Sequence, residues 1–208
     1  SHDRRVNFIQ IGANDGLRSD PIRELIVRDF WQGVLIEPLP NVFSLLQHNY
    51  RHISPKRLTF VNAAITDGGD QNLTFWTYRS SFLKSLPLEL RLDLLRKSSF
   101  SREHLERTLP KEYRGEEVFH AIQVPCLTLG EVIQQHWCAE PIDLIVIDAE
   151  GHEASIIPNI DFESIHPEVI FFESHNLREQ KESIFELLRS HQYELTEIEG
   201  NAAAVRCD

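Results

Sequence analysis

The sequence predicts an α/β protein in which helices flank a mostly parallel β-sheet. Short apolar runs alternate with amphipathic stretches along the chain, which is the pattern of strands joined by crossover helices. The first apolar run, VNFIQI at Val6–Ile11, ends at a glycine. The most apolar run, IDLIVI at Ile142–Ile147, is predicted to be a central strand that is buried on both faces.

The remaining elements follow from the same alternation. The first helix is expected over Pro21–Phe30, with Asp20 as its N-cap and proline at its first position. Further helices are expected over Asn41–Tyr50 and over Glu179–Ser190, where apolar residues recur at helical spacing. Further strands are expected at Gly33–Ile36, Leu58–Asn62 and Val169–Phe172, followed by a closing antiparallel hairpin of Tyr193–Ile198 and Ala202–Arg206.

One segment, from about Phe82 to Val118, breaks this rhythm and predicts a helical insert within a single domain spanning residues 1–208. One helix is expected over Pro87–Lys97, and a second between Ser101, as its N-cap, and Pro110. The leucines of these helices must pack on something. The insert is therefore expected to be a cap beside the ligand site that supplies part of the acceptor pocket, and a dimerisation arm is the alternative.

The same insert is locally basic. Residues 84–114 hold eight Lys or Arg and five Asp or Glu, whereas the whole chain has a formal net charge of −11. The basic side chains are expected to form a solvated helix face, with the alternative that they hold an anionic acceptor. They are Arg91, Arg96, Lys97, Arg102 and Arg107.

Composition also limits the partners. An acidic surface repels nucleic acid and anionic membranes, so neither is expected as a partner. The three cysteines, Cys126, Cys138 and Cys207, show no CxxC spacing. No signal peptide is visible, and no run approaches the roughly 20 apolar residues that cross a bilayer. A cytoplasmic protein is therefore expected, and a homodimer is left open.

A glycine-containing turn carries the clearest functional signal. QIGANDG, Gln10 to Gly16, follows the first predicted strand and precedes the first helix. Glycines there let the backbone approach a ligand, and amides near the helix start favour an anionic group. Glu37 ends the second predicted strand, where a carboxylate can accept hydrogen bonds from both ribose hydroxyls. The turn is not GxGxxG, which weakens a dinucleotide interpretation.

These motifs together resemble one known family. FIQIGANDG, LIEPLPNVFSLLQHNY, VNAAITD, VPCLTLGEVI and LIVIDAEGHEASII are similar to segments of FkbM-type methyltransferases, over about Asn7 to Phe172. The resemblance implies a Rossmann-like methyltransferase fold with a mostly parallel seven-stranded sheet, and S-adenosylmethionine as the methyl donor. The anionic group at the glycine turn would then be the methionine carboxylate.

The resemblance also implies the cofactor contacts. They are expected from the turn, from the end of the second strand and from three residues beside the adenine. The predicted set is Gln10, Gly12, Ala13, Asn14, Asp15, Gly16, Glu37, Pro38, Asn62, Ala63, Ala64 and Asp148. Many relatives carry Asp at the position of Gln10, so a carboxylate contact to the methionyl amine is not expected there.

A second group of ionisable residues follows the central strand. Asp148, Glu150 and His152 lie in IDAEGHE, and the next strand leads to His175. Neighbouring parallel strands lie about 4.8 Å apart, so these side chains are expected to converge at one sheet edge. His152 and His175 are the candidate general bases because their ordinary pKa is near neutrality. Asp148 and Glu150 are candidates to orient the acceptor, the methionyl amine or a base.

Two further expectations concern the same edge. Glu153 is expected to face solvent on the following helix. Asp148, Glu150, His152, Glu173 and His175 also match divalent-metal ligands in residue type, but their spacing is not a recognised metal signature. A metal is therefore an alternative that is not favoured.

The predicted function is methyl transfer from S-adenosylmethionine to a hydroxyl of a small molecule such as a sugar or polyketide. Acid–base groups beside a methyl donor suit a hydroxyl acceptor, whose proton must be removed. N-methylation of an amine or peptide is one alternative and needs less base catalysis. A nucleotide-binding interaction module without turnover is the other.

Overall fold

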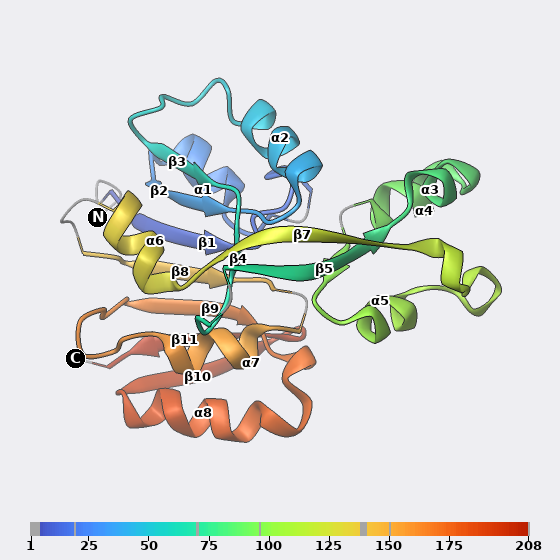
Figure 1. The fold of residues 1–208 in the computed structure, drawn as a ribbon. Helices are drawn as coiled ribbons and strands as arrows, with labels where there is room; N and C mark the ends of the chain where they lie inside the picture. The colour runs from blue at the N-terminus through green and yellow to red at the C-terminus, as the bar shows by residue number, and fades with distance from the viewer. Residues whose placement is uncertain are drawn as a thin grey trace.

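The computed structural model describes residues 5–207 apart from 19, 70, 96, 138–140 and 150. A seven-stranded sheet lies at its centre, in the order β10-β11-β9-β8-β1-β2-β3 (Figure 1). Within this sheet, β9, β8, β1, β2 and β3 run parallel to one another. β11 runs antiparallel to both β9 and β10. The structure therefore confirms the α/β class and the mostly parallel seven-stranded sheet.

The central strands follow the apolar runs closely. β1 and β8 are buried at every position, as expected for strands covered on both faces. β8 pairs with β1 on one side and with β9 on the other, which confirms its central position. The strand bounds are β1 Asn7–Ile11, β2 Gln32–Ile36, β3 Leu58–Val61, β8 Leu144–Ile147, β9 Val169–Glu173, β10 Tyr193–Ile198 and β11 Asn201–Arg206.

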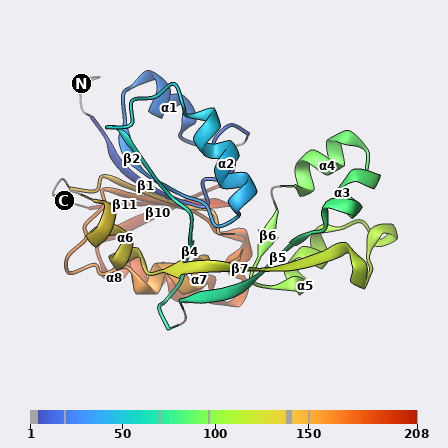
Figure 2. The same ribbon diagram turned by 45° about the horizontal axis from the view of Figure 1, so that its top comes forward.

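Helices cover both faces of this sheet (Figure 2). Ile26 of α1 and Leu46 of α2 belong to the apolar cluster on one face. Leu129 of α6, Ile156 of α7 and Ile184 of α8 belong to the cluster on the other face. The helix bounds are α1 Arg23–Arg28, α2 Pro40–Asn49, α6 Leu129–His136, α7 Glu153–Ile156 and α8 Lys181–Ser190.

The first helix begins later than predicted. α1 starts at Arg23 rather than at Pro21. The Asp20 carboxylate nevertheless accepts hydrogen bonds from the amides of Ile22 and Arg23, at 3.0 and 3.1 Å. Asp20 thus satisfies free amides at the start of the helix, which is the capping role that the sequence predicted for it. Among the helices of the described residues, none is long and apolar enough to cross a bilayer.

A second sheet, which was not predicted, carries the insert. It has four strands in the order β4-β7-β5-β6. Its long strands, β5 Asn72–Tyr78 and β7 Phe119–Leu127, form an antiparallel ribbon. β4 Ala64–Ile65 and β6 Ser98–Ser99 are two-residue strands at its edges. The ribbon extends beyond the main sheet and bears the helices at its far end (Figures 1 and 2).

The segment Phe82–Val118 is mostly helical, as predicted, and the strands of the ribbon on either side of it were not predicted. Its helices are α3 Ser80–Ser85, α4 Leu88–Leu94 and α5 Arg102–Thr108, and 3₁₀ turns follow at Lys111–Tyr113 and Glu116–Val118. The Ser101 side chain accepts a hydrogen bond from the His104 amide, which confirms the predicted cap of α5. The period-two alternation of Leu73, Phe75 and Thr77 was the overlooked strand signal.

The insert has an apolar core of its own. Leu83, Leu94 and Leu105 pack with the ribbon aromatics Tyr78 and Phe119. The sequence predicted that the leucines of the insert helices are packed against other apolar residues. They pack on one another and on the ribbon. The insert can therefore keep its shape while it extends from the main sheet.

Replacing Leu105 by Ala tests this separate core. Leu105 is 1% exposed, and truncation of such a leucine costs about 2–5 kcal/mol of unfolding free energy. We expect amide hydrogen exchange to accelerate chiefly in residues 72–127, while β1 and β8 keep their protection. Leu88→Ala is the control because Leu88 is 59% exposed and should change stability by at most about 0.5 kcal/mol. Equal exchange in the two variants would contradict a separate insert core.

Candidate active site

The turn after β1 brings the ends of β1 and β8 into close approach. Gly12 has a φ of +75°, and a Cβ at this position would lie 1.8 Å from the carbonyl oxygen of Asp148. Only glycine fits there, for reasons of both space and conformation. Asn14, two residues on, also has a positive φ of 51°. The turn is thereby held against the end of the central strand.

The amides of this turn are already used within the protein, contrary to the expectation that they bind an anion. The amides of Gly12 and Ala13 donate to the carbonyl of Ile36, at 3.0 and 2.9 Å. The Asn14 amide donates to Glu37 Oε2 at 3.0 Å, and the Asp15 amide to Asn14 Oδ1 at 2.8 Å. An anionic ligand group at this edge would therefore depend on cationic side chains.

Asp15 and Gly16 shape the turn, and neither is among the lining residues of the cavities at this edge. Asp15 is buried, and its Oδ1 accepts hydrogen bonds from the amides of Leu17 and Arg18, both at 3.0 Å. A Cβ at Gly16 would lie 2.4 Å from the Tyr50 ring. The structure thus gives these two residues a supporting position.

Glu37 is a buried carboxylate at the end of β2. It is 5% exposed, and its two oxygens accept hydrogen bonds from the amides of Asn14 and Leu39, at 3.0 and 2.9 Å. Burial raises the pKa of Glu37 to about 8, and the negative charges of Asp148 and Asp15 act in the same direction. When Glu37 is ionised, each oxygen keeps a second lone pair, so the carboxylate can still accept two hydrogen bonds from a ligand.

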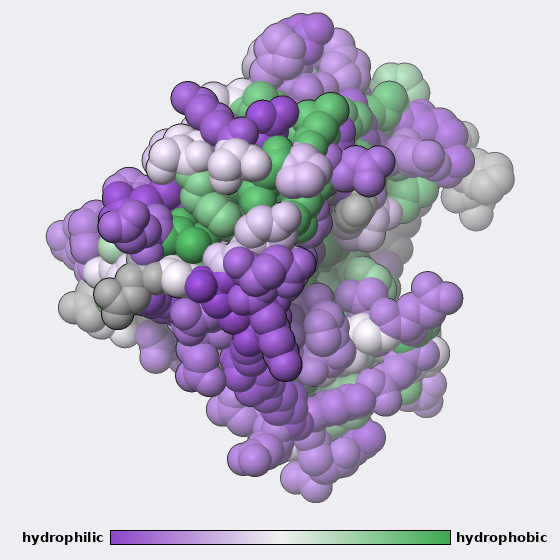
Figure 3. Space-filling model, turned by 90° about the vertical axis from the view of Figure 1, so that its right-hand side faces the viewer, coloured by the Kyte–Doolittle hydropathy of each residue, from purple (hydrophilic) through white to green (hydrophobic). Residues whose placement is uncertain are grey.

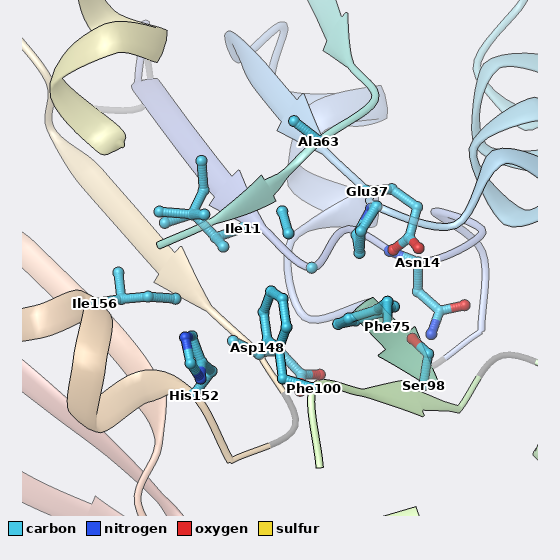
Figure 4. A pocket seen from close by; sticks show the side chains of 15 residues that line it. Ile11, Asn14, Glu37, Ala63, Phe75, Ser98, Phe100, Asp148, His152 and Ile156 are labelled. Carbon is cyan, nitrogen blue, oxygen red and sulfur yellow. The ribbon is translucent and has the colours of Figure 1, made fainter. Parts of the chain in front are cut away.

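A cavity lies beside Glu37 (Figure 4), and its empty space, together with the solvent at its open side, measures about 550 Å³. The main sheet supplies part of its wall through the predicted residues Gly12, Asn14, Glu37, Pro38, Ala63, Ala64 and Asp148. Asn62, also predicted, does not line it. Its Nδ2 instead donates to the carbonyls of Glu37 and Pro38, at 2.8 and 3.1 Å, which holds the segment after β2 in place.

The ribbon and the insert supply the facing wall through residues that the sequence did not predict. Phe75 of β5, Ser98 of β6 and Phe100 after it line the cavity (Figure 4). The rings of Phe75 and Phe100 pack edge to face with centroids 4.8 Å apart. The alternating pattern of β5 was the one sequence signal that could have indicated Phe75 as a residue lining the cavity. No local pattern marks Ser98 or Phe100.

A second hollow, of about 570 Å³, lies on the other side of Gly12, Asn14 and Asp148. Gln10 lines it and is 2% exposed. Its Nε2 donates to Asp20 Oδ1 at 3.3 Å, while its Oε1 has no hydrogen-bond partner among the described residues. A buried acceptor without a partner is costly, and an ammonium group of a ligand would satisfy it. Ala13, Arg18 and Lys97 line the same hollow, together with the carboxylates of Asp20, Asp93 and Asp148. Lys97 Nζ lies 3.4 Å from Asp93 Oδ2.

Of the candidate catalytic residues, Asp148 and His152 line the 550 Å³ cavity. Asp148 lines both the 550 Å³ cavity and the hollow beside Gln10. The His152 ring packs on Phe100 with centroids 4.6 Å apart. Burial lowers the pKa of His152 below its ordinary value of 6.5, against an opposing effect of Asp67. His152 is thus a neutral imidazole at pH 7, as a general base requires. Glu150 lies outside the described residues.

His175 is not brought to the cavity. Its side chain is 59% exposed, and its Nδ1 lies 3.3 Å from Glu173 Oε1. A Cβ added at Gly200, in the turn between β10 and β11, would lie 3.4 Å from the same nitrogen. β8 and β9 are neighbouring strands, but the residues that follow them do not bring His175 and His152 into one site.

Glu153 corrects an expectation, because it is fully buried rather than solvent-facing. Its oxygens accept hydrogen bonds from the amides of Ala149 and Gly151, at 2.7 and 3.0 Å. Burial raises the pKa of Glu153 to about 7, despite these hydrogen bonds. It therefore shapes the loop that carries His152. Asp148, Glu153 and Glu173 each offer an oxygen within 4.8 Å of the others, but the amide contacts already give Glu153 a structural role.

The fold and this site define a class of enzyme. A parallel sheet has a glycine turn after its first strand, a buried acid after the second and a cavity between them. The orphaned Gln10 oxygen and the Glu37 carboxylate fit the amine and ribose of S-adenosylmethionine. This is the class of Rossmann-like S-adenosylmethionine-dependent methyltransferases.

Comparison with known proteins identifies the family. The model of the methyltransferase FkbM domain matches residues 10–195, so the chain belongs to the FkbM methyltransferase family. It is an enzyme, an S-adenosylmethionine-dependent methyltransferase. No curated protein matches the chain significantly.

Solved structures agree on the fold. Methyltransferase FkbM from Methylobacillus flagellatus KT is similar with a TM-score of 0.52 and 12% identity, over 98% of this chain and 44% of that chain. The METTL16 MTase domain is similar with a TM-score of 0.53 and 9% identity, over 99% of this chain and 62% of that chain. The chain thus spans less than two thirds of either protein, and identities this low show the fold alone.

The raised pKa of Glu37 predicts how stability depends on pH. Without ligand, folded Glu37 keeps its proton up to about pH 8, whereas the unfolded side chain loses it near 4.5. Between these values the unfolded state binds fewer protons. Glu37 therefore lowers the unfolding free energy as pH rises, by up to about 1.4 kcal/mol per pH unit. Glu37→Gln should remove this slope, as measured by urea unfolding from pH 5 to 9. Parallel pH profiles of variant and wild type would contradict the raised pKa.

Proposed function

We propose that this enzyme methylates a hydroxyl group of a small molecule, with His152 as the general base. S-adenosylmethionine, when bound, supplies an electrophilic methyl group on a sulfonium sulfur. One observation carries the proposal. His152 lines both the 550 Å³ cavity and a larger hollow of about 1170 Å³ on its other side. An acceptor in the larger hollow would therefore meet the methyl donor beside a neutral imidazole.

The cofactor would be held by residues of the main sheet. Glu37 would accept hydrogen bonds from the ribose hydroxyls, and Ala63 and Ala64 would line the adenine side. Gln10 Oε1 would accept from the methionyl amine, because that buried oxygen has no partner among the described residues. Arg18 and Lys97 would neutralise the methionine carboxylate, since the amides from Gly12 to Asp15 already donate elsewhere.

The state of His152 favours a hydroxyl over an amine as the acceptor. His152 would accept the hydroxyl proton as the oxygen replaces sulfur on the methyl carbon, leaving an ether and S-adenosylhomocysteine. A neutral amine can attack without such a base, so a buried, neutral histidine supports O-methylation more than N-methylation. Packing of the His152 ring on Phe100 restricts its orientation and shields it from water.

The acceptor would be a small molecule, such as a sugar, polyketide or similar metabolite. The larger hollow lies between α5 of the insert and the segment after β9, so the insert would supply part of the acceptor site. The formal net charge of −11 supports a small molecule over nucleic acid or an anionic membrane as the partner.

Cofactor affinity tests the binding half of this proposal. Glu37→Ala removes both acceptor oxygens, and we expect binding of S-adenosylmethionine and S-adenosylhomocysteine to weaken by about 1.5–3 kcal/mol. Calorimetry of wild type and variant measures the difference. Glu131→Ala is the control, because Glu131 contacts Thr128 at the start of α6 and lines neither cavity. Equal affinity of Glu37→Ala and wild type would remove Glu37 from the ribose site.

Turnover tests the catalytic half. His152→Ala should lower kcat by about 10²–10⁴-fold with little change in cofactor affinity. In the wild type, kcat should rise with pH through a value below 6.5 and be level above neutrality, because His152 must be deprotonated. His175→Ala is the matched control because His175 is 59% exposed and pairs with Glu173. A larger loss in His175→Ala than in His152→Ala would reverse the assignment.

A further inference from the structure

The larger hollow beside His152 has a chemistry of its own. Two of its walls are α5 of the insert and the 3₁₀ segment η4, His175–Gln180, which follows β9. Ser99, Phe100, Gly151 and His152 line the rest. Figure 3 views the insert end of the molecule, where hydrophilic side chains predominate and the most extensive apolar area lies in the upper part of the view. If the proposed function holds, this hollow is where the acceptor sits, and its side chains indicate what the acceptor carries.

Cationic and hydrogen-bonding groups dominate this hollow. Arg107 extends from α5 and Arg178 from η4, while His104 and Asn176 add polar atoms. Glu179 is the one acidic side chain among the described residues that line it. In a protein with a formal net charge of −11, two guanidinium groups in one hollow attract an anion to that place.

Neither arginine has a strong partner that would explain its position. Arg107 lies 3.4 Å from Glu103 on the same helix, but the two side chains are 44% and 79% exposed, so solvent screens this pair. The Arg178 side chain has no hydrogen-bond or ion-pair partner among the described residues. Its backbone is at φ 51° and ψ −123°, a conformation that side-chain-bearing residues rarely adopt. Strain of this kind is typical of ligand-binding segments.

We propose that this hollow binds an anionic acceptor: a small hydroxylated molecule with a phosphate or carboxylate group held by Arg107 and Arg178. Each guanidinium offers paired donors that match the oxygens of either anion. With the anionic group held between α5 and η4, the hydroxyl of the same molecule reaches His152 in the wall shared with the cofactor cavity. A neutral acceptor leaves Arg178 without a partner among the described residues and leaves Arg107 with the solvent-exposed Glu103 alone.

The test uses inorganic phosphate and acetate as probes on the full chain saturated with S-adenosylhomocysteine. The cofactor product keeps the anions out of its own site. Nuclear magnetic resonance at constant pH follows His104, Gly151 and His152 during each titration. We expect saturable shifts of these signals. Shifts with phosphate alone indicate a phosphorylated acceptor, and equal shifts with acetate indicate that a carboxylate suffices.

Variants assign the binding to the two arginines. Arg107→Ala with Arg178→Ala should weaken anion binding by about 10- to 100-fold, the usual effect of removing hydrogen bonds to a charged group. Lys111→Ala is the matched control, because it removes one positive charge from the insert outside the hollow. Binding of S-adenosylhomocysteine is measured first in every sample by calorimetry, and its absence would count against the proposed function.

Two results would overturn the anionic acceptor and leave the methyltransferase site intact. One is a wild-type protein that binds S-adenosylhomocysteine but shows no saturable shift with either anion. The other is an anion affinity that is the same in the double variant and in wild type. Loss of binding in the Lys111→Ala control as large as in the double variant would likewise reject a specific role of Arg107 and Arg178.

Discussion

The close approach of β1 and β8 at Gly12 is the constraint on which the site depends. A Cβ at this residue would lie 1.8 Å from the Asp148 carbonyl oxygen, so no other residue allows the two strand ends to meet. The contact places the turn that follows β1 beside the loop that follows β8. The Asn14 amide then donates a hydrogen bond to the Glu37 carboxylate. Asp148 lines both the 550 Å³ cavity and the hollow beside Gln10. A small backbone requirement thus positions side chains from three strands.

Burial then sets the charge state of the groups at this edge. It raises the pKa values of Glu37 and Glu153 to about 8 and 7, and it lowers that of His152. In each case loss of solvent disfavours the charged form, which is why acids and the histidine shift in opposite directions. The protein therefore holds a neutral base near neutral pH. It also holds Glu37 as an acid whose raised pKa keeps it protonated up to about pH 8.

The insert completes what the main sheet begins. The sheet supplies one wall of the 550 Å³ cavity. Phe75 of β5, Ser98 of β6 and Phe100 after it supply the other wall. The insert has an apolar cluster of its own, which shares no residue with the two clusters that cover the main sheet.

The sequence by itself determined the class, the central strands, the glycine turn and Glu37, because these depend on local periodicity and on short motifs. It also indicated His152 as a candidate general base, because His152 follows the most apolar strand. It did not reveal the second sheet, whose strands pair residues that are far apart in the chain. Only the tertiary structure decided that Asp15 and Asn62 support the site, that Glu153 is buried and that His175 lies outside the cavities. Burial and the direction of a side chain arise from packing between distant segments, and no spacing within the chain encodes them.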